Sequence, residues 1–203
     1  MSLELIIKKK RIIFTRIFVA AVAAALLFSW SRWEVNELYS TFLFTVGMVM
    51  VGFATVGRLW CNLYICGYKT GTLITSGPYS MCRNPLYFFS LTGAIGVGLT
   101  TETVSFAVLC LVVFLMYYPF VIRAEEKRLA KIHGSEYQQY LKEVPGFIPS
   151  LKRFHEPEEY TVMAKSFRKS LFDAMWFIWL VAIVEIIEAF HEANVLPVYI
   201  NLY

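Results

Sequence analysis

The sequence is poor in charge and lacks several common functional signatures. Charged residues make up 17% of its 203 residues, and the formal net charge is only +4. No basic face with interleaved aromatic residues is apparent, which argues against a nucleic-acid partner. No strand–GxGxxG–helix unit occurs either, so the sequence does not indicate a Rossmann domain.

The few cysteines do not form a metal-binding or disulfide pattern. They lie within or beside apolar segments, at Cys61, Cys66, Cys82 and Cys110. None forms a C-x-x-C pair, and no paired histidines accompany them. The pattern is typical of buried, reduced thiols, and we expect no bound metal.

Apolar residues are abundant and lie in long blocks. They account for 58% of the chain, and the mean hydropathy is +0.56, above that of ordinary soluble domains. Long apolar blocks are typical of membrane-spanning helices. The sequence therefore predicts one integral membrane domain over residues 1–203, an all-α polytopic bundle of about five spans with a cytoplasmic amphipathic helical segment.

The expected spans are residues 12–31, 39–60, 85–100, 104–122 and 171–190. A signal peptide is the alternative for the first, but the run is longer than a signal-peptide core and a second span follows closely. We expect three parts: residues 1–71 with two spans and the start of a loop, 72–149 as the central unit, and 150–203 as a linker and fifth span.

The central unit should be a helical hairpin. Asn84 precedes Pro85, which disfavours helical geometry before the proline and predicts a helix start at Pro85. A short turn near residues 100–103 returns the chain to the side it left. Arg83 and Glu125, at the two ends of the hairpin, should therefore lie on the same face of the membrane.

Beyond Glu126, apolar residues recur at helical spacing between charges, which predicts an amphipathic helix at the membrane surface. Gly134 should interrupt this helix, Ser135 and Gln138 match a capping box that restarts it, and Pro145 ends it. Arg32 is the only basic residue in a far-side loop, so the positive-inside rule puts the N-terminus and the Arg83 end of the bundle in the cytoplasm.

Several polar side chains near the hairpin ends are suited to chemistry. Arg83 can bind a carboxylate or phosphate, although an arginine at this border also reaches lipid phosphates. Glu125 and Glu126 cannot share one helix face, so one can point inward to accept hydrogen bonds, pair with Arg83 or act as a base. The alternative is a solvated charge run over residues 123–128.

Four tyrosines of the central unit form a further candidate group. They can line an aromatic pocket for a cationic group or serve as interfacial residues, and they are Tyr79, Tyr87, Tyr137 and Tyr140. By contrast, we expect Glu185, Glu188 and His191 near the outer face, because Glu185 lies about 21 Å along its helix from residue 171.

Two groups of residues carry a family resemblance. The first is Thr72 to Tyr79 with Arg83-Asn84-Pro85-Leu86-Tyr87; the second is Glu125-Glu126 followed by Leu129, Gly134, Tyr137, Tyr140, Val144-Pro145 and Pro149. In this order and spacing they resemble the isoprenylcysteine carboxyl methyltransferase family and its phospholipid methyltransferase relatives, which are multi-span membrane enzymes.

The resemblance implies S-adenosylmethionine as cofactor and a lipophilic or membrane-associated methyl acceptor. It implies catalytic roles for Arg83 and Glu125, and cofactor contacts from Tyr79, Arg83, Asn84, Pro85, Tyr87, Glu125, Glu126, Tyr137 and Tyr140. Two positions depart from the family pattern. Asn84 replaces the usual histidine and cannot take up a proton near neutral pH, and Gly146 replaces a basic or polar residue.

Two other readings stay open at this point. Helical membrane reductases that use NADPH are distantly similar around the C-terminal half. A non-catalytic membrane scaffold or lipid binder is the second alternative, and Asn84 favours it.

Overall fold

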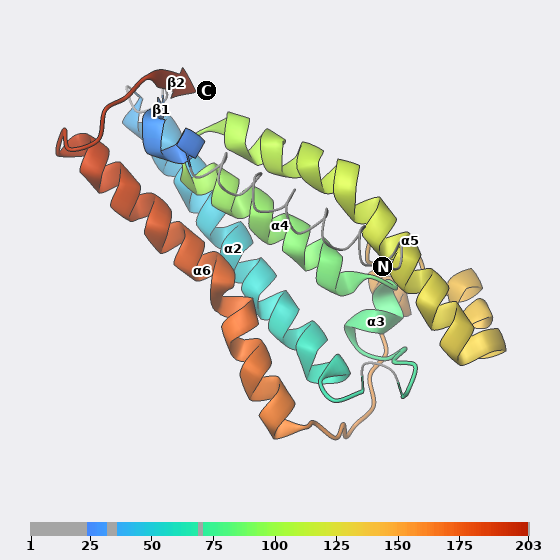
Figure 1. The fold of residues 1–203 in the computed structure, drawn as a ribbon. Coiled ribbons are helices and arrows are strands. Elements are labelled where there is room, and N and C mark those ends of the chain that lie inside the picture. The colour runs from blue at the N-terminus through green and yellow to red at the C-terminus, as the bar shows by residue number, and fades with distance from the viewer. Residues whose placement is uncertain (1–23, 32–35, 69–70, 203) are drawn as a thin grey trace, which may run out of the picture.

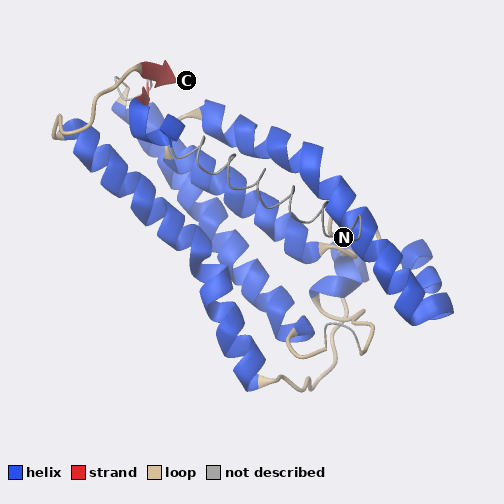
Figure 2. Ribbon diagram, in the orientation of Figure 1, coloured by secondary structure: helices blue, strands red, loops and turns tan. Residues whose placement is uncertain are grey.

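The computed structural model describes residues 24–31, 36–68 and 71–202. Its elements are β1 (Ser29–Ser31), α2 (Glu37–Ile65), α3 (Pro78–Met81), α4 (Pro85–Thr100), α5 (Val104–Glu143), the 3-10 helix η2 (Leu151–Arg153), α6 (Ala164–Glu192) and β2 (Ile200–Leu202). Four long helices dominate, and β1 pairs in parallel with β2 near one end (Figures 1 and 2). Most of the predicted first span, 12–23, lies outside the described residues.

The prediction of an all-α membrane bundle is confirmed. Among the described residues, α2, α5 and α6 are long and apolar enough to cross a membrane, and α4 is a shorter apolar helix. With 16 residues α4 is about 24 Å long, less than a typical hydrocarbon core. The four predicted spans from residue 39 onward each lie within one of these helices.

The predicted hairpin is also present. Helix α4 begins at Pro85, with Asn84 as its N-cap residue, and ends at Thr100. Residues 101–103 form the turn, in which Glu102 adopts a positive φ of 54°. Helix α5 then runs back along α4, so both ends of the hairpin lie at one end of the bundle, called here the site end (Figure 1).

Helices α2 and α4 approach closely at two glycines of α2. A Cβ atom on Gly47 would lie 2.7 Å from the backbone oxygen of Gly96, and one on Gly57 would overlap the ring of Phe89. Gly52 has nothing within 4 Å of the same position. Of these three glycines of α2, Gly47 and Gly57 therefore allow the close approach of α4 and Gly52 does not contribute to it.

A partly buried arginine joins three helices. Arg58 of α2 donates a hydrogen bond to Ser90 of α4 and another, 3.4 Å long, to the backbone oxygen of Asp173 in α6. Its guanidinium also lies 5.6 Å from the ring centre of Phe177.

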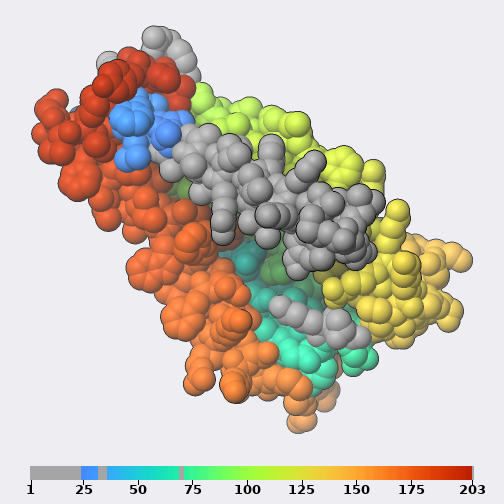
Figure 3. Space-filling view, viewed as in Figure 1, coloured from blue at the N-terminus to red at the C-terminus, as the bar shows by residue number. Residues whose placement is uncertain are grey.

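Figure 3 shows α6, in orange, and the yellow part of α5 on opposite sides of one face.

Helix α5 differs from the sequence prediction. It continues without a break from the span through the charged run 123–128, whose residues all favour helix, so the amphipathic segment starts as part of the same helix. The predicted interruption at Gly134 is confirmed by its φ of 53° and ψ of −123°. Exposed apolar side chains along the span, including Leu115, Met116 and Phe120, leave much of α5 facing outward.

Candidate active site

The chain between α2 and α4 folds over the site end of the bundle. Gly77 has a φ of 59°, and a Cβ there would overlap the ring of Tyr64, so glycine is required on both counts. The short helix α3 follows at once, with Pro78 in its first turn. This arrangement places Tyr79 and Arg83 beside the start of α4.

Backbone hydrogen bonds hold the segment after α5 against the loop between α2 and α4, which carries Arg83 and is called here the Arg83 loop. The N–H of Arg83 donates to the oxygen of Pro145 at 2.9 Å, and the N–H of Ser150 donates to Met81 at 3.0 Å. The N–H of Gly77 donates to the oxygen of His155, also at 2.9 Å. The segment after α5 therefore lies directly against the loop that carries Arg83.

Arg83 forms an inward network rather than an open anion site. Its Nε donates to Oε1 of Glu126 at 3.0 Å, and this ion pair has side chains only 16% and 20% exposed. Its Nη1 donates to the backbone oxygens of Leu141 at 2.9 Å and Val144 at 2.6 Å. Arg83 thus satisfies carbonyl groups at the C-terminal end of α5.

The two positions that depart from the family pattern lie together in this network. Asn84 is buried, and its Nδ2 donates to Oε1 of Glu126 at 3.1 Å and to the oxygen of Gly146 at 2.9 Å. An amide NH₂ serves two acceptors, whereas a neutral imidazole has a single N–H. A Cβ on Gly146 would lie 3.1 Å from Nη2 of Arg83, so its absence admits the guanidinium.

Glu125 has a different environment from its neighbour Glu126. Its Oε2 accepts a hydrogen bond from the hydroxyl of Tyr87 at 2.8 Å, and the side chain is exposed. The Tyr87 ring meets that of Tyr118 edge-on, 5.4 Å between centres. Of the two adjacent glutamates, Glu126 holds the network and Glu125 is available to a ligand.

A cavity of about 210 Å³ brings most of the predicted residues together. It is lined by Tyr79, Arg83, Asn84, Tyr87, Glu125, Tyr137 and Tyr140, with apolar residues from the loop and the end of α2. Pro85 and Glu126 do not line it. Pro85 starts α4, and Glu126 supports two lining residues from behind.

Two tyrosines of the cavity, Tyr79 and Tyr140, are joined by a hydrogen bond. Tyr140 donates its hydroxyl to the backbone oxygen of Tyr79 at 2.7 Å. Burial raises the pKa of Tyr79 well above its ordinary value, so its hydroxyl remains a donor at physiological pH. Tyr137 lies beside Tyr140, with ring centres 5.9 Å apart.

The sequence analysis missed Arg128 and Tyr68 as cavity residues. Arg128 lies three residues after Glu125, the spacing that puts two side chains on one helix face, and both line the cavity. Helical spacing within the charged run was therefore a usable signal. Tyr68 follows the C-terminal end of α2 and had no signal of its own.

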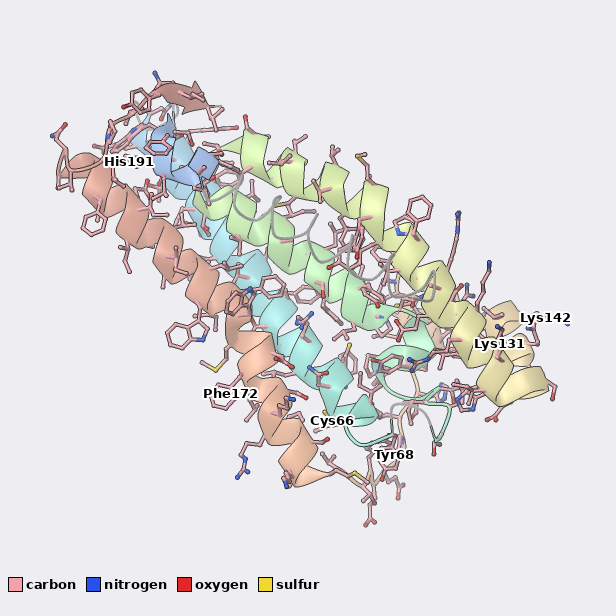
Figure 4. All side chains as sticks on the ribbon, in the orientation of Figure 1. Cys66, Tyr68, Lys131, Lys142, Phe172 and His191 are labelled. Carbon is pink, nitrogen blue, oxygen red and sulfur yellow. The ribbon has the colours of Figure 1, made fainter. Side chains whose placement is uncertain are left out.

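The far end of the bundle holds a separate polar cluster. His191 is buried, and its Nε2 lies 3.0 Å from the backbone oxygen of Leu27. It lines a cavity of about 40 Å³ with Trp30 and Glu188. Figure 4 shows His191 at the opposite end from Cys66 and Tyr68, as the helix-length argument predicts. Within the described residues no group of three or more His, Cys, Asp or Glu side chains could hold a metal ion.

Comparison with known proteins identifies the class. The model of the phospholipid methyltransferase family matches residues 19–136, and the chain belongs to this family. The resemblance noted in the sequence is thereby confirmed, and the family supports a membrane methyltransferase.

Individual relatives carry two kinds of name. The chain is 41% identical to the cobalt-zinc-cadmium resistance protein CzcN of Cupriavidus metallidurans, over 99% of this chain and 92% of the relative. It is 38% identical to the nickel-cobalt-cadmium resistance protein NccN of Alcaligenes xylosoxydans xylosoxydans, over 98% and 93%. It is 30% identical to the protein-S-isoprenylcysteine O-methyltransferase of Mus musculus, over 63% of this chain and 51% of the relative. No solved structure matches.

Proposed function

We propose that this protein transfers the methyl group of S-adenosylmethionine to a lipophilic or membrane-associated acceptor. The observation that carries the proposal is the cavity at the site end, where residues distant in sequence and matching the family motifs meet. The membership of the phospholipid methyltransferase family supports the same reaction class.

The chemistry of the cavity lining suits S-adenosylmethionine. The cofactor carries a sulfonium and an amine, which aromatic faces and carboxylates attract, and a carboxylate, which a guanidinium attracts. Tyr79, Tyr87 and Tyr137 supply rings, Glu125 a carboxylate and Arg128 a guanidinium. When bound, the cofactor supplies an electrophilic methyl group on a positively charged sulfur.

Glu125 is the residue we place closest to the chemistry. Its carboxylate can accept hydrogen bonds from a ribose or amino group of the cofactor. It can also take the proton that an amine or thiol acceptor must lose. A carboxylate acceptor has no such proton, and then only alignment and exclusion of water are needed.

The predicted catalytic role of Arg83 stays a prediction. Its Nε and Nη1 already serve Glu126, Leu141 and Val144, which leaves Nη2 for a carboxylate of the cofactor or acceptor. We assign Arg83 first a positioning role, because it holds the segment after α5 over the cavity.

Calorimetric titration of S-adenosylmethionine into the detergent-purified protein tests the proposal. We expect saturable binding that weakens in Glu125→Gln and is unchanged in Glu136→Gln, an exposed glutamate of α5 outside the cavity. Labelled methyl transfer into a lipid extract then identifies the acceptor.

The alternatives give different results in the same titration. Preferential binding of NADPH would favour a membrane reductase. Failure of the folded protein to bind either cofactor would favour a scaffold or lipid binder and overturn the methyltransferase proposal. Arg83→Ala is a poor sole test, because it also removes the network contacts described above.

We further propose that the site end faces the cytoplasm in a multi-pass arrangement. Basic residues of η2 and of the first turns of α6 cluster at this end, and they are Lys152, Arg153, Lys165, Arg168 and Lys169. A cysteine introduced at Glu158, in the exposed linker, should react with a membrane-impermeant maleimide only after the cells are opened.

A role in metal resistance is a second candidate, favoured by the full-length similarity to the two resistance proteins. Expression in a cobalt- and cadmium-sensitive host tests it. Growth that improves with the wild-type protein and not with Glu125→Gln would connect resistance with the candidate active site. No improvement in either strain would remove this candidate.

A further inference from the structure

An apolar groove runs along the outside of the bundle at the site end. Its volume is about 740 Å³, and it is lined by side chains of α2, α4 and the segment after α5, including Phe53, Trp60, Phe88, Leu151 and Phe154. The rings of Trp60 and Phe154 lie 5.7 Å apart, so the segment after α5 packs across onto α2.

This groove continues into a polar depression. The depression, of about 610 Å³, is lined by Lys142 and Arg153 among others, and it shares Ile148 and Pro149 with the apolar groove. One end of the continuous cleft is therefore cationic and the remainder is apolar.

The two cations at this end, Lys142 and Arg153, have no ion-pair partner in the part of the chain that the structure describes. Of the other charged residues of the depression, Arg83 is paired with Glu126, and the Glu143 carboxylate accepts a hydrogen bond from Nε2 of the neutral Gln139 at 2.8 Å. Basic side chains therefore outnumber acidic ones in the lining of the depression. An anion bound between Lys142 and Arg153 would compensate the positive charges of these two side chains.

The wall of the cleft also has the character of a membrane interface. Ile148 and Leu151, the latter at the start of η2, are large apolar residues that are nevertheless 75% and 80% exposed. They adjoin Lys152 and Arg153. Apolar side chains beside basic ones are the pattern by which protein segments enter the headgroup region of anionic membranes.

We propose that this cleft binds an anionic phospholipid, with the phosphate between Lys142 and Arg153 and an acyl chain along the groove. Such a lipid is distinct from a methyl acceptor. Among the described residues, the apolar groove shares no lining residue with the candidate active-site cavity, whereas the polar depression shares Arg83 with it. The proposal does not depend on methyl transfer.

The bound lipid would support the site from outside. Ser150, which lines the depression, donates its N–H to the oxygen of Met81, which lines the groove. The bound lipid would therefore contact and stabilise the segment after α5, which forms backbone hydrogen bonds with the Arg83 loop.

Fluorescence quenching of Trp60 tests the proposal directly. The full chain, with its other four tryptophans changed to phenylalanine, is reconstituted in phosphatidylcholine vesicles. The fraction of lipid that is brominated in the acyl chain is increased from zero, in one series as phosphatidylglycerol and in the other as phosphatidylcholine. We expect half-maximal quenching at about a tenfold lower fraction of the anionic lipid, since two basic residues contact it.

A charge-matched pair of variants isolates the cleft. Lys142→Gln with Arg153→Gln should move the phosphatidylglycerol curve toward that of phosphatidylcholine. Lys127→Gln with Lys131→Gln removes the same charge from exposed positions of α5 outside the cleft and should leave the curve in place. Equal quenching by both lipids, or equal shifts in both double variants, would overturn the proposal.

A second measurement covers the case in which the single-tryptophan protein does not fold. Native mass spectrometry of the otherwise unaltered protein should show retained phosphatidylglycerol, and at least a threefold lower occupancy in the cleft variant than in its charge-matched control. Equal occupancy in the two double variants would contradict a specific site.

Discussion

The two ends of the bundle both bury polar groups but use them differently. At the far end, His191 meets the backbone oxygen of Leu27 beside a cavity of only about 40 Å³. At the site end, Arg83, Asn84 and Glu126 satisfy one another and the chain after α5, next to a cavity of about 210 Å³. Glu125 faces that cavity and is exposed.

The difference separates polar groups that hold the structure from those available to a ligand. A buried polar group is costly unless it is satisfied, so satisfied networks stabilise the fold. Glu125 and Glu126 are neighbours in sequence, yet they fall on opposite sides of this division. Changes at each of them, and at matched positions elsewhere, test it.

The largest effect should follow Glu126→Ala. This change leaves the mostly buried Arg83 without its ion-pair partner and should lower the free energy of unfolding by about 3 kcal/mol. Glu125→Ala, on an exposed neighbour, should cost less than about 0.5 kcal/mol. Thermal unfolding in detergent compares the two, and equal losses would contradict the division of roles.

Gly47→Ala should have the next largest effect. The added Cβ would lie 2.7 Å from the backbone oxygen of Gly96, which cannot rotate away, so we expect a loss of about 2 kcal/mol. Gly52→Ala meets nothing within 4 Å and should be neutral or slightly stabilising, because alanine favours helix. Thermal unfolding in detergent compares the two variants with the wild type. A Gly47→Ala protein as stable as the wild type would mean that α2 and α4 lie farther apart.

Glu125→Gln should weaken binding of S-adenosylmethionine about tenfold while leaving unfolding nearly unchanged. The amide keeps the size of the side chain and loses the charge, and a hydrogen bond to a charged group is worth about 1.5 kcal/mol or more. Calorimetry on the variant and wild type measures the ratio. Unaltered affinity would place the cofactor away from Glu125.

The smallest effect is expected at the far end. His191→Leu removes the bond to Leu27 and should cost about 1 kcal/mol of stability, with no change in affinity for S-adenosylmethionine. Glu192→Gln, at an exposed neighbour, is the control for charge and position. A loss of cofactor affinity in His191→Leu would show that the two ends are coupled.

Local signals in the sequence predicted much of the fold. The start of α4 depends on Pro85 and the residue before it, and the break at Gly134 depends on one glycine, so both could be read directly. The continuity of α5 through the charged run was missed, because the end of an apolar block was taken as the end of a helix.

The composition of the cavity was predictable, but the roles of its residues were not. The motif residues gather as expected, yet which glutamate meets Arg83 depends on the rotation of α5 about its axis. That rotation is set by tertiary contacts such as those of Asn84 with Glu126 and Gly146. No local pattern in the sequence reports them.

The backbone hydrogen bonds between the Arg83 loop and the chain after α5 have a consequence for biosynthesis. These bonds join Arg83 to Pro145 and Gly77 to His155, so each partner is synthesised long after the residue that it pairs with. A nascent chain that has inserted the hairpin still lacks these partners. The cavity therefore reaches its final shape only after the ribosome has released the residues through His155, so we expect a ligand to bind there only after that stage of synthesis.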